Sequence, residues 1–167
     1  MSTTVKIKKI IKRPRGDKPG LVDIELIDKT YYVEISADIY GEVPEEESCV
    51  EAELELHSVG DYDLFKNEDE FMKEKEGLMA PQSIIPTGSF SIGQEGWKKS
   101  SEVFLNGKIL AVQEYDDIYT AKIECLNVVY YATLEKSKGR KPEVGNIISS
   151  LFKTEMIIEK KEGQTWS

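Results

Sequence analysis

The side chains best suited to chemistry lie in one short segment around His57, which is the only histidine of the chain. In CVEAELELHS, apolar and polar residues alternate, so Glu53, Glu55 and His57 are expected on one face of a β-strand. Asp61 and Asp63 follow closely in the sequence. Carboxylates and an imidazole can bind a divalent cation, but neighbours on one strand face lie about 7 Å apart. A metal site would therefore need a ligand from another strand, and a solvated strand face explains these residues more simply.

A second stretch to test for chemistry is PTGSFSIGQEGW, residues 86–97. Gly88 and Gly93 have the interval of a phosphate-binding P-loop, but Gln94 and Glu95 stand where that motif needs lysine and a hydroxyl residue. We therefore interpret the stretch as a connector between strands. The chain has no other cofactor motif and no recognisable pairing of a nucleophile with a base. We predict no cofactor, no metal ion and no enzymatic activity.

Charge is unevenly distributed along the 167 residues. The formal net charge is −9, although residues 1–20 contain seven basic side chains and one acidic side chain. An acidic body repels nucleic acid and suits a basic protein, so we expect a protein partner and consider nucleic acid the weaker alternative. The N-terminal lysines are most simply those of an edge strand, where they oppose aggregation.

The sequence also indicates a cellular compartment. Cys49 and Cys125 match no metal-binding spacing, and the basic start lacks the apolar segment of a signal peptide. No apolar run approaches the roughly 18 residues of a membrane helix. We therefore predict a cytoplasmic protein without a membrane span, with Cys125 as a small core residue.

Alternation of apolar and polar residues predicts a mainly β protein with one short helix, built from curved antiparallel sheets or a partly open Greek-key barrel. Strands are expected in TTVKIKKIIK, LVDIELI, TYYVEISADI, CVEAELELHS, VFLNGKILAVQEY, IYTAKIECL, VVYYATL and GNIISSLFKTEMIIE. Asn67 and Glu70 form a capping box and Gly77 takes the C-terminal cap position, which predicts a helix over about 67–76.

The chain divides into two regions. The N-terminal β region, residues 1–101, holds the helix and an irregular connector, and residues 102–167 form a second β region. We expect the two regions to share one core. Each half contains a hairpin, but no internal repeat is convincing in the sequence.

Residues 102–159 resemble the OB-fold, a five-stranded Greek-key barrel. The resemblance rests on a long bent strand, two strands in a meander, a loop, and KPEVGNII entering a further strand. We interpret Asn106-Gly107 as a bulge in the long strand, because the apolar parity shifts across it. The connection after Leu134 is short and holds no obvious helix, which departs from the common pattern. The resemblance implies a surface that binds oligonucleotides, sugars or protein, but it assigns no function.

The loop KSKGRKP carries the one basic cluster of the C-terminal region. In an OB-type barrel, Lys138, Arg140 and Lys141 would contact phosphates of a single strand while Tyr131 stacks on a base. A solvated turn beside core tyrosines explains the same residues.

These observations together predict a non-enzymatic binding protein with a protein partner. One concrete version is a bacterial immunity-like protein, a small acidic chain that neutralises a basic toxin by charge complementarity. Its contact residues would be Glu51, Glu53, Glu55, Asp61, Tyr62 and Asp63. The alternatives are an OB-type single-stranded nucleic-acid binder that uses the basic loop, and a metal-dependent enzyme centred on His57.

Overall fold

The computed structural model describes residues 3–12, 19–27, 32–40, 44–87, 91–93, 96–98 and 100–158. In these ranges the protein is mainly β with one short α-helix, as predicted. The strands are β1 (Thr3–Lys12), β2 (Pro19–Ile27), β3 (Tyr32–Tyr40), β4 (Cys49–Ser58), β5 (Asp63–Phe65), β6 (Ser83–Pro86), β7 (Ser91–Gly93), β8 (Gly96–Lys98), β9 (Glu102–Glu114), β10 (Ile118–Cys125), β11 (Val128–Glu135) and β12 (Ile147–Ile158).

The helix α1 (Glu68–Glu74) begins where the capping box predicts it. The Asn67 side chain accepts a hydrogen bond from the Glu70 backbone N–H at 2.9 Å. The helix ends earlier than predicted: its C-cap is Lys75, Glu76 follows with a positive φ of 52°, and Gly77, with a φ of 71°, lies one residue beyond the cap position predicted for it. Phe71 is buried on the side of α1 that faces β5, and its ring lies edge-on to Phe65 with centroids 5.0 Å apart. A single 3₁₀ turn follows β11 at residues 136–138.

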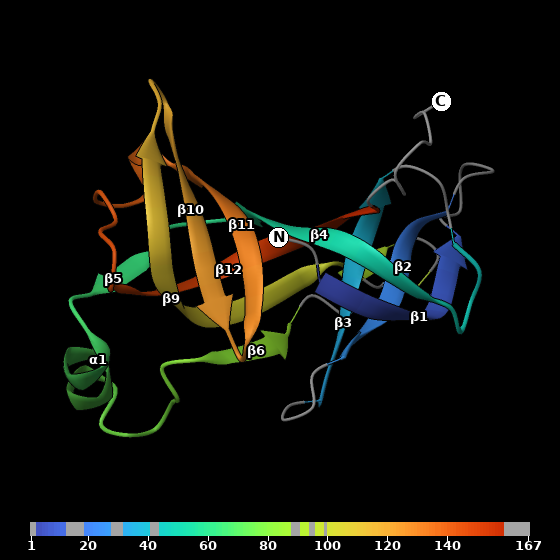
Figure 1. Cartoon of the computed structure of the whole chain (residues 1–167), viewed down its shortest axis with the longest axis horizontal. Helices are drawn as coiled ribbons and strands as arrows, with labels where there is room; N and C mark the ends of the chain where they lie inside the picture. The colour runs from blue at the N-terminus through green and yellow to red at the C-terminus, as the bar shows by residue number, and fades with distance from the viewer. Residues whose placement is uncertain are drawn as a thin grey trace.

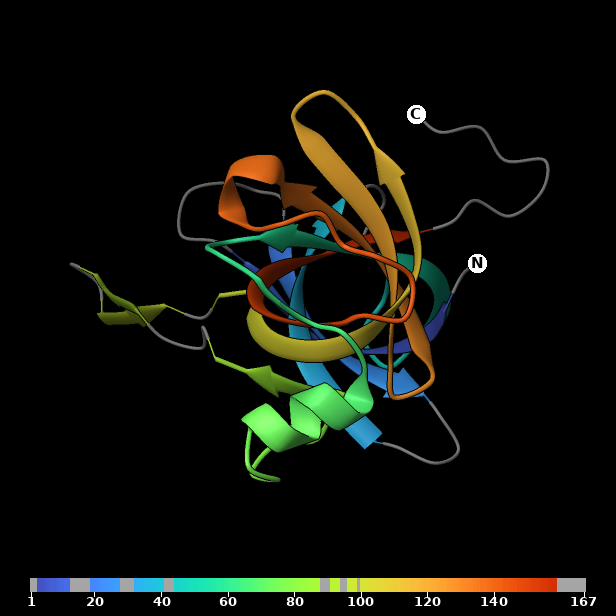
Figure 2. The same ribbon diagram turned by 90° about the vertical axis from the view of Figure 1, so that its left-hand side faces the viewer.

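Ten strands form one sheet in the order β5-β12-β3-β2-β1-β4-β11-β10-β9-β6, and β7 pairs separately with β8. Further pairings of β12 with β4 and β9 close this sheet on itself. One ring runs β9–β10–β11–β4–β12 and back to β9. The other runs β1–β2–β3–β12–β4 and back to β1. The result is barrel-like, and Figure 2 shows the strands curving around a common centre.

Strands β4 and β12 belong to both rings. Figure 1 shows them crossing the middle of the molecule, with β9–β11 on one side and β1–β3 on the other. Each ring contains one parallel pair, β11 with β4 in the first and β3 with β12 in the second. All the other pairs are antiparallel.

The two halves of the chain repeat one arrangement. In each half, three antiparallel strands are followed by a fourth that pairs with the first strand of its own half and the third strand of the other half. The first strand carries an extra residue at the same point. Lys8 follows Ile7 in β1, and Leu110 follows Ile109 in β9, as the register shifts against β2 and β10 show.

The turn before the fourth strand is repeated as well. The Glu47 N–H donates to the Ile7 carbonyl at 2.7 Å, and the Gly145 N–H donates to the Ile109 carbonyl at 2.8 Å. Both turn residues have positive φ, 64° at Glu47 and 92° at Gly145. The fold therefore contains an internal repeat that is not convincing in the sequence, since glutamate in one turn and glycine in the other occupy the same backbone position.

One cluster of buried apolar side chains runs through both rings. Its members on β1–β4 and on β9–β12 include Ile7, Ile24, Ile35, Leu54, Leu56, Leu105, Ile109, Ile123, Tyr130, Phe152 and Met156. Cys125 belongs to this cluster, as predicted, and burial raises the pKa of its thiol to about 12. The N-terminal and C-terminal β regions therefore contribute to the same core.

Two local interpretations need correction. The first strand is not an edge strand, because β1 lies between β2 and β4. Two of its lysines pair with acids: Lys6 Nζ lies 3.1 Å from Glu47 and Lys8 Nζ lies 3.6 Å from Glu25. In β9 the extra residue is Leu110, so the bulge does not lie at Asn106-Gly107.

The connector at residues 86–97 contains the small β7–β8 hairpin. Gly93 ends β7 and pairs with Gly96 of β8. Gly88, Gln94 and Glu95, which the P-loop comparison used, lie outside the described residues.

Gly107 lets β9 pass close to β10. A Cβ at this position would lie 2.5 Å from Ile123 Cγ2 and 3.0 Å from the Glu124 carbonyl oxygen. We therefore expect Gly107→Ala to lower the free energy of unfolding by about 1–3 kcal/mol, the usual cost of overpacking a core. Urea unfolding measures this change. The control is Gly60→Ala, whose Cβ would meet no atom within 4 Å, and equal losses in both variants would contradict the prediction.

Candidate functional site

The outer face of β4 carries the polar residues that the sequence singled out. Glu53, Glu55 and His57 are half-buried, while Leu54 and Leu56 between them are fully buried in the core. This alternation is the predicted one, and it arises because β4 has the core on one side and solvent on the other. Glu51 lies on the same face, is exposed, and accepts a hydrogen bond from the Thr4 hydroxyl.

Another strand does bring a carboxylate to this face of β4, namely Glu155 of β12. The antiparallel register places Glu155 directly opposite Glu55. His57 Nε2 lies 2.8 Å from Glu155 Oε2 and 3.9 Å from Glu55 Oε2. The alternation in β12 puts Glu155 on the outer face, but the sequence does not say which strand lies beside it. The sequence alone therefore provides no reason to group Glu155 with His57 and Glu55.

This cluster has an excess of negative charge. The pKa of Glu55 is raised, first by burial and then by the nearby charges of Glu53 and Glu155, while His57 acts in the opposite direction. A carboxyl group shifted upward in this way gains from any added positive charge. A positive charge placed beside Glu55 would oppose this upward shift of its pKa.

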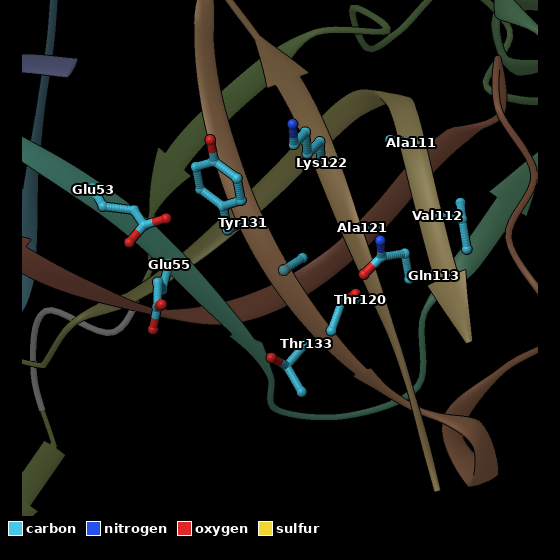
Figure 3. A pocket seen from close by; sticks show the side chains of 11 residues that line it. Glu53, Glu55, Ala111, Val112, Gln113, Thr120, Ala121, Lys122, Tyr131 and Thr133 are labelled. Atoms are coloured by element: carbon cyan, nitrogen blue, oxygen red, sulfur yellow. The ribbon is translucent and has the colours of Figure 1, made fainter. Parts of the chain in front are cut away.

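A groove of about 400 Å³ lies beside this cluster, across the outer face of β4, β11, β10 and β9. Its polar lining comes from Glu53, Glu55, Gln113, Thr120, Lys122, Tyr131 and Thr133. Figure 3 shows the two carboxylates at one side and Gln113 at the other, with Tyr131 next to Lys122 between them. Lys122 Nζ lies 5.7 Å from the centre of the Tyr131 ring, a cation–π distance. The groove offers hydrogen-bond acceptors, donors and one aromatic face.

The remaining acidic candidates lie elsewhere. Asp61 and Asp63 are exposed at the entry to β5, whereas the Tyr62 side chain is only 4 % exposed. The Tyr62 hydroxyl donates to the Arg140 carbonyl at 2.9 Å, and its backbone N–H donates to the Lys138 carbonyl at 3.1 Å. This segment therefore packs against the basic loop, and Tyr62 is a structural residue of that contact.

The basic loop makes several internal contacts. Arg140 Nη2 donates to the Leu64 carbonyl at 2.6 Å. Lys141 Nζ and Lys136 Nζ lie 3.1 Å and 2.9 Å from the carboxylate of Glu114. Tyr131 lies apart from these residues, in the groove. The residues of the nucleic-acid alternative are therefore divided between the groove, which also holds Glu53 and Glu55, and the loop.

Comparison with family models, with curated proteins and with solved structures gives no match for this chain. Among the residues that the structure describes, the single α-helix is far too short to cross a bilayer.

The contact between Tyr62 and the basic loop can be tested through pH. Burial raises the pKa of Tyr62 to about 12, whereas a tyrosine in the unfolded chain ionises near pH 10. Above about pH 10 the unfolded chain therefore binds fewer protons, and stability falls as the pH rises towards 12. Tyr62→Phe should lose about 1 kcal/mol at pH 7 with its hydrogen bond, and its stability should fall less steeply between pH 10 and 12.

Urea unfolding at neutral and alkaline pH measures both effects. The control is Tyr115→Phe, because Tyr115 is 52 % exposed and its hydroxyl donates to the exposed Gln113. The free energy of unfolding of Tyr115→Phe should equal that of the wild type at every pH. A Tyr62→Phe variant with wild-type stability at pH 7 would show that the bond to Arg140 contributes nothing.

Proposed function

We propose that this chain is a non-enzymatic binding protein that holds a basic segment of a protein partner in the groove over β4, β11, β10 and β9. One observation carries the proposal: Glu53 and Glu55 form one side of a groove whose negative charge is incompletely balanced. A lysine or arginine side chain of a partner would supply the missing positive charge. That the protein is not an enzyme stays a prediction from the sequence.

The strand arrangement supports a binding surface in this place. We propose that the ring β9–β10–β11–β4–β12 is an OB-type barrel in which β4, from the N-terminal region, supplies the strand that residues 102–159 lack. In OB-folds the face of the second and third strands binds ligands. Here those strands are β10 and β11, which supply Thr120, Lys122, Tyr131 and Thr133 to the groove.

The immunity-like version of this function is a narrower form of the same proposal. A basic toxin would approach the acidic face of β4, on which Glu51 extends the line of Glu53 and Glu55 beyond the groove. Asp61 and Asp63, which lie outside the groove, would add long-range electrostatic attraction for the toxin. Charge of this kind mainly accelerates association, and added salt reduces the effect.

The proposal is tested by replacing the two groove carboxylates with their neutral isosteres. We expect the double variant Glu53→Gln/Glu55→Gln to bind a short labelled peptide rich in lysine and arginine about 3- to 10-fold more weakly than the wild type. This range follows from two partly exposed charge interactions. Fluorescence anisotropy at low and moderate salt measures the affinity, and the salt dependence should be smaller in the variant.

Glu102→Gln is the matched control, because Glu102 is half-buried on β9 but lies outside the groove. It should bind the peptide as the wild type does. A labelled single-stranded oligothymidylate tests the alternative ligand in the same assay. Oligothymidylate binding that tightens in the double variant, with no binding of the basic peptide, would favour the nucleic-acid alternative and overturn the proposal.

A further inference from the structure

The cluster on the outer face of the β4–β12 pair combines three donor atoms of the kinds that bind metals. One oxygen of Glu55, one ring nitrogen of His57 and one oxygen of Glu155 lie within 4.8 Å of one another. Their side chains are 31 %, 41 % and 23 % exposed, so each is accessible and yet partly held by its neighbours. The donors project from two paired strands at the centre of the fold, which fixes their relative positions.

The arrangement of charge indicates that a cation belongs there. Glu55 and Glu155 face each other directly across the strand pair, and like charges in this position are destabilising. Among the described residues, His57 is the one basic side chain within ion-pair distance of either carboxylate. The two negative charges therefore exceed what the neighbouring side chain balances, even when the imidazole is protonated.

The donor spacing suits a small dication. Bonds of about 2.0–2.1 Å to nitrogen and oxygen place the donors of a tetrahedral Zn²⁺ site about 3.4 Å apart. The observed separations from His57 Nε2, 2.8 Å and 3.9 Å, lie on either side of this value. Small side-chain rotations would therefore form the site. Glu155 is also oriented through its second oxygen, which accepts a hydrogen bond from the Tyr40 hydroxyl at 3.4 Å.

We propose that Glu55, His57 and Glu155 form a Zn²⁺ site that joins β4 to β12. One nitrogen and two oxygen donors favour a first-row transition metal over Mg²⁺ or Ca²⁺, which prefer all-oxygen sites. Three protein ligands leave the remaining position of a tetrahedral ion open to solvent. The site shares Glu55 with the groove proposed to hold a basic segment, but its test uses no partner, so the two proposals can fail independently.

The test follows His57 directly, because a chain with one histidine gives one set of imidazole signals in an NMR spectrum. The full chain carries Cys49→Ser, since that exposed thiol could itself bind Zn²⁺, and it is freed of metal with EDTA. Added ZnCl₂ should shift the His57 signals until one equivalent is bound, and MgCl₂ at the same concentration should leave them unchanged.

One variant and one matched control test whether Glu155 is a ligand. In Glu155→Gln, the ZnCl₂ concentration needed for half of the shift should rise about ten-fold or more, since a ligand is lost. Glu102→Gln, a half-buried glutamate outside the cluster, should titrate as the parent does. His57 signals that ZnCl₂ does not move, or a Glu155→Gln variant that titrates as the parent does, would overturn the proposal.

Discussion

The antiparallel pairing of β4 with β12 is the contact on which both rings depend. Leu54 lies opposite Met156 and Leu56 opposite Thr154, and all four side chains are buried in the shared core. The intervening pair, Glu55 and Glu155, points to the outer face. Because side chains alternate along a strand, the register that fills the core also brings the two carboxylates together. A slip of one residue would bury the charges and expose the apolar side chains.

Local features of this protein could be predicted from its sequence, and long-range ones could not. The outward face of β4 and the start of α1 at Asn67 follow from alternation and capping, which involve neighbours in the chain. The position of β1 between two strands depends on its pairing with β4, and that contact has no local signal. Glu155 illustrates the same limit, since His57 meets it only because β12 lies beside β4.

The candidate binding residues show how charge in a sequence differs from charge available to a ligand. Glu114 holds Lys136 and Lys141, and Arg140 uses its guanidinium to bind a backbone carbonyl. These side chains of the basic loop therefore already make intramolecular contacts, which leaves less of their charge available to a ligand. On β4, by contrast, the pairing with β12 adds the carboxylate of Glu155 to those already on the strand, so the negative charge there increases. This difference made the acidic face, and not the basic loop, the better candidate for a partner.

The exchange of fourth strands between the two halves has a consequence for the order of folding during synthesis. Strands β1 to β3 and β9 to β11 can each form as local meanders, but β12 completes both rings and is the last described strand to leave the ribosome. Until then β3 and β9 each lack a neighbour, and β4 has no antiparallel partner for the segment that carries His57. Long-range closure of this kind is slow, and open strand edges associate with other chains. The nascent protein therefore remains aggregation-prone until β12 has been made.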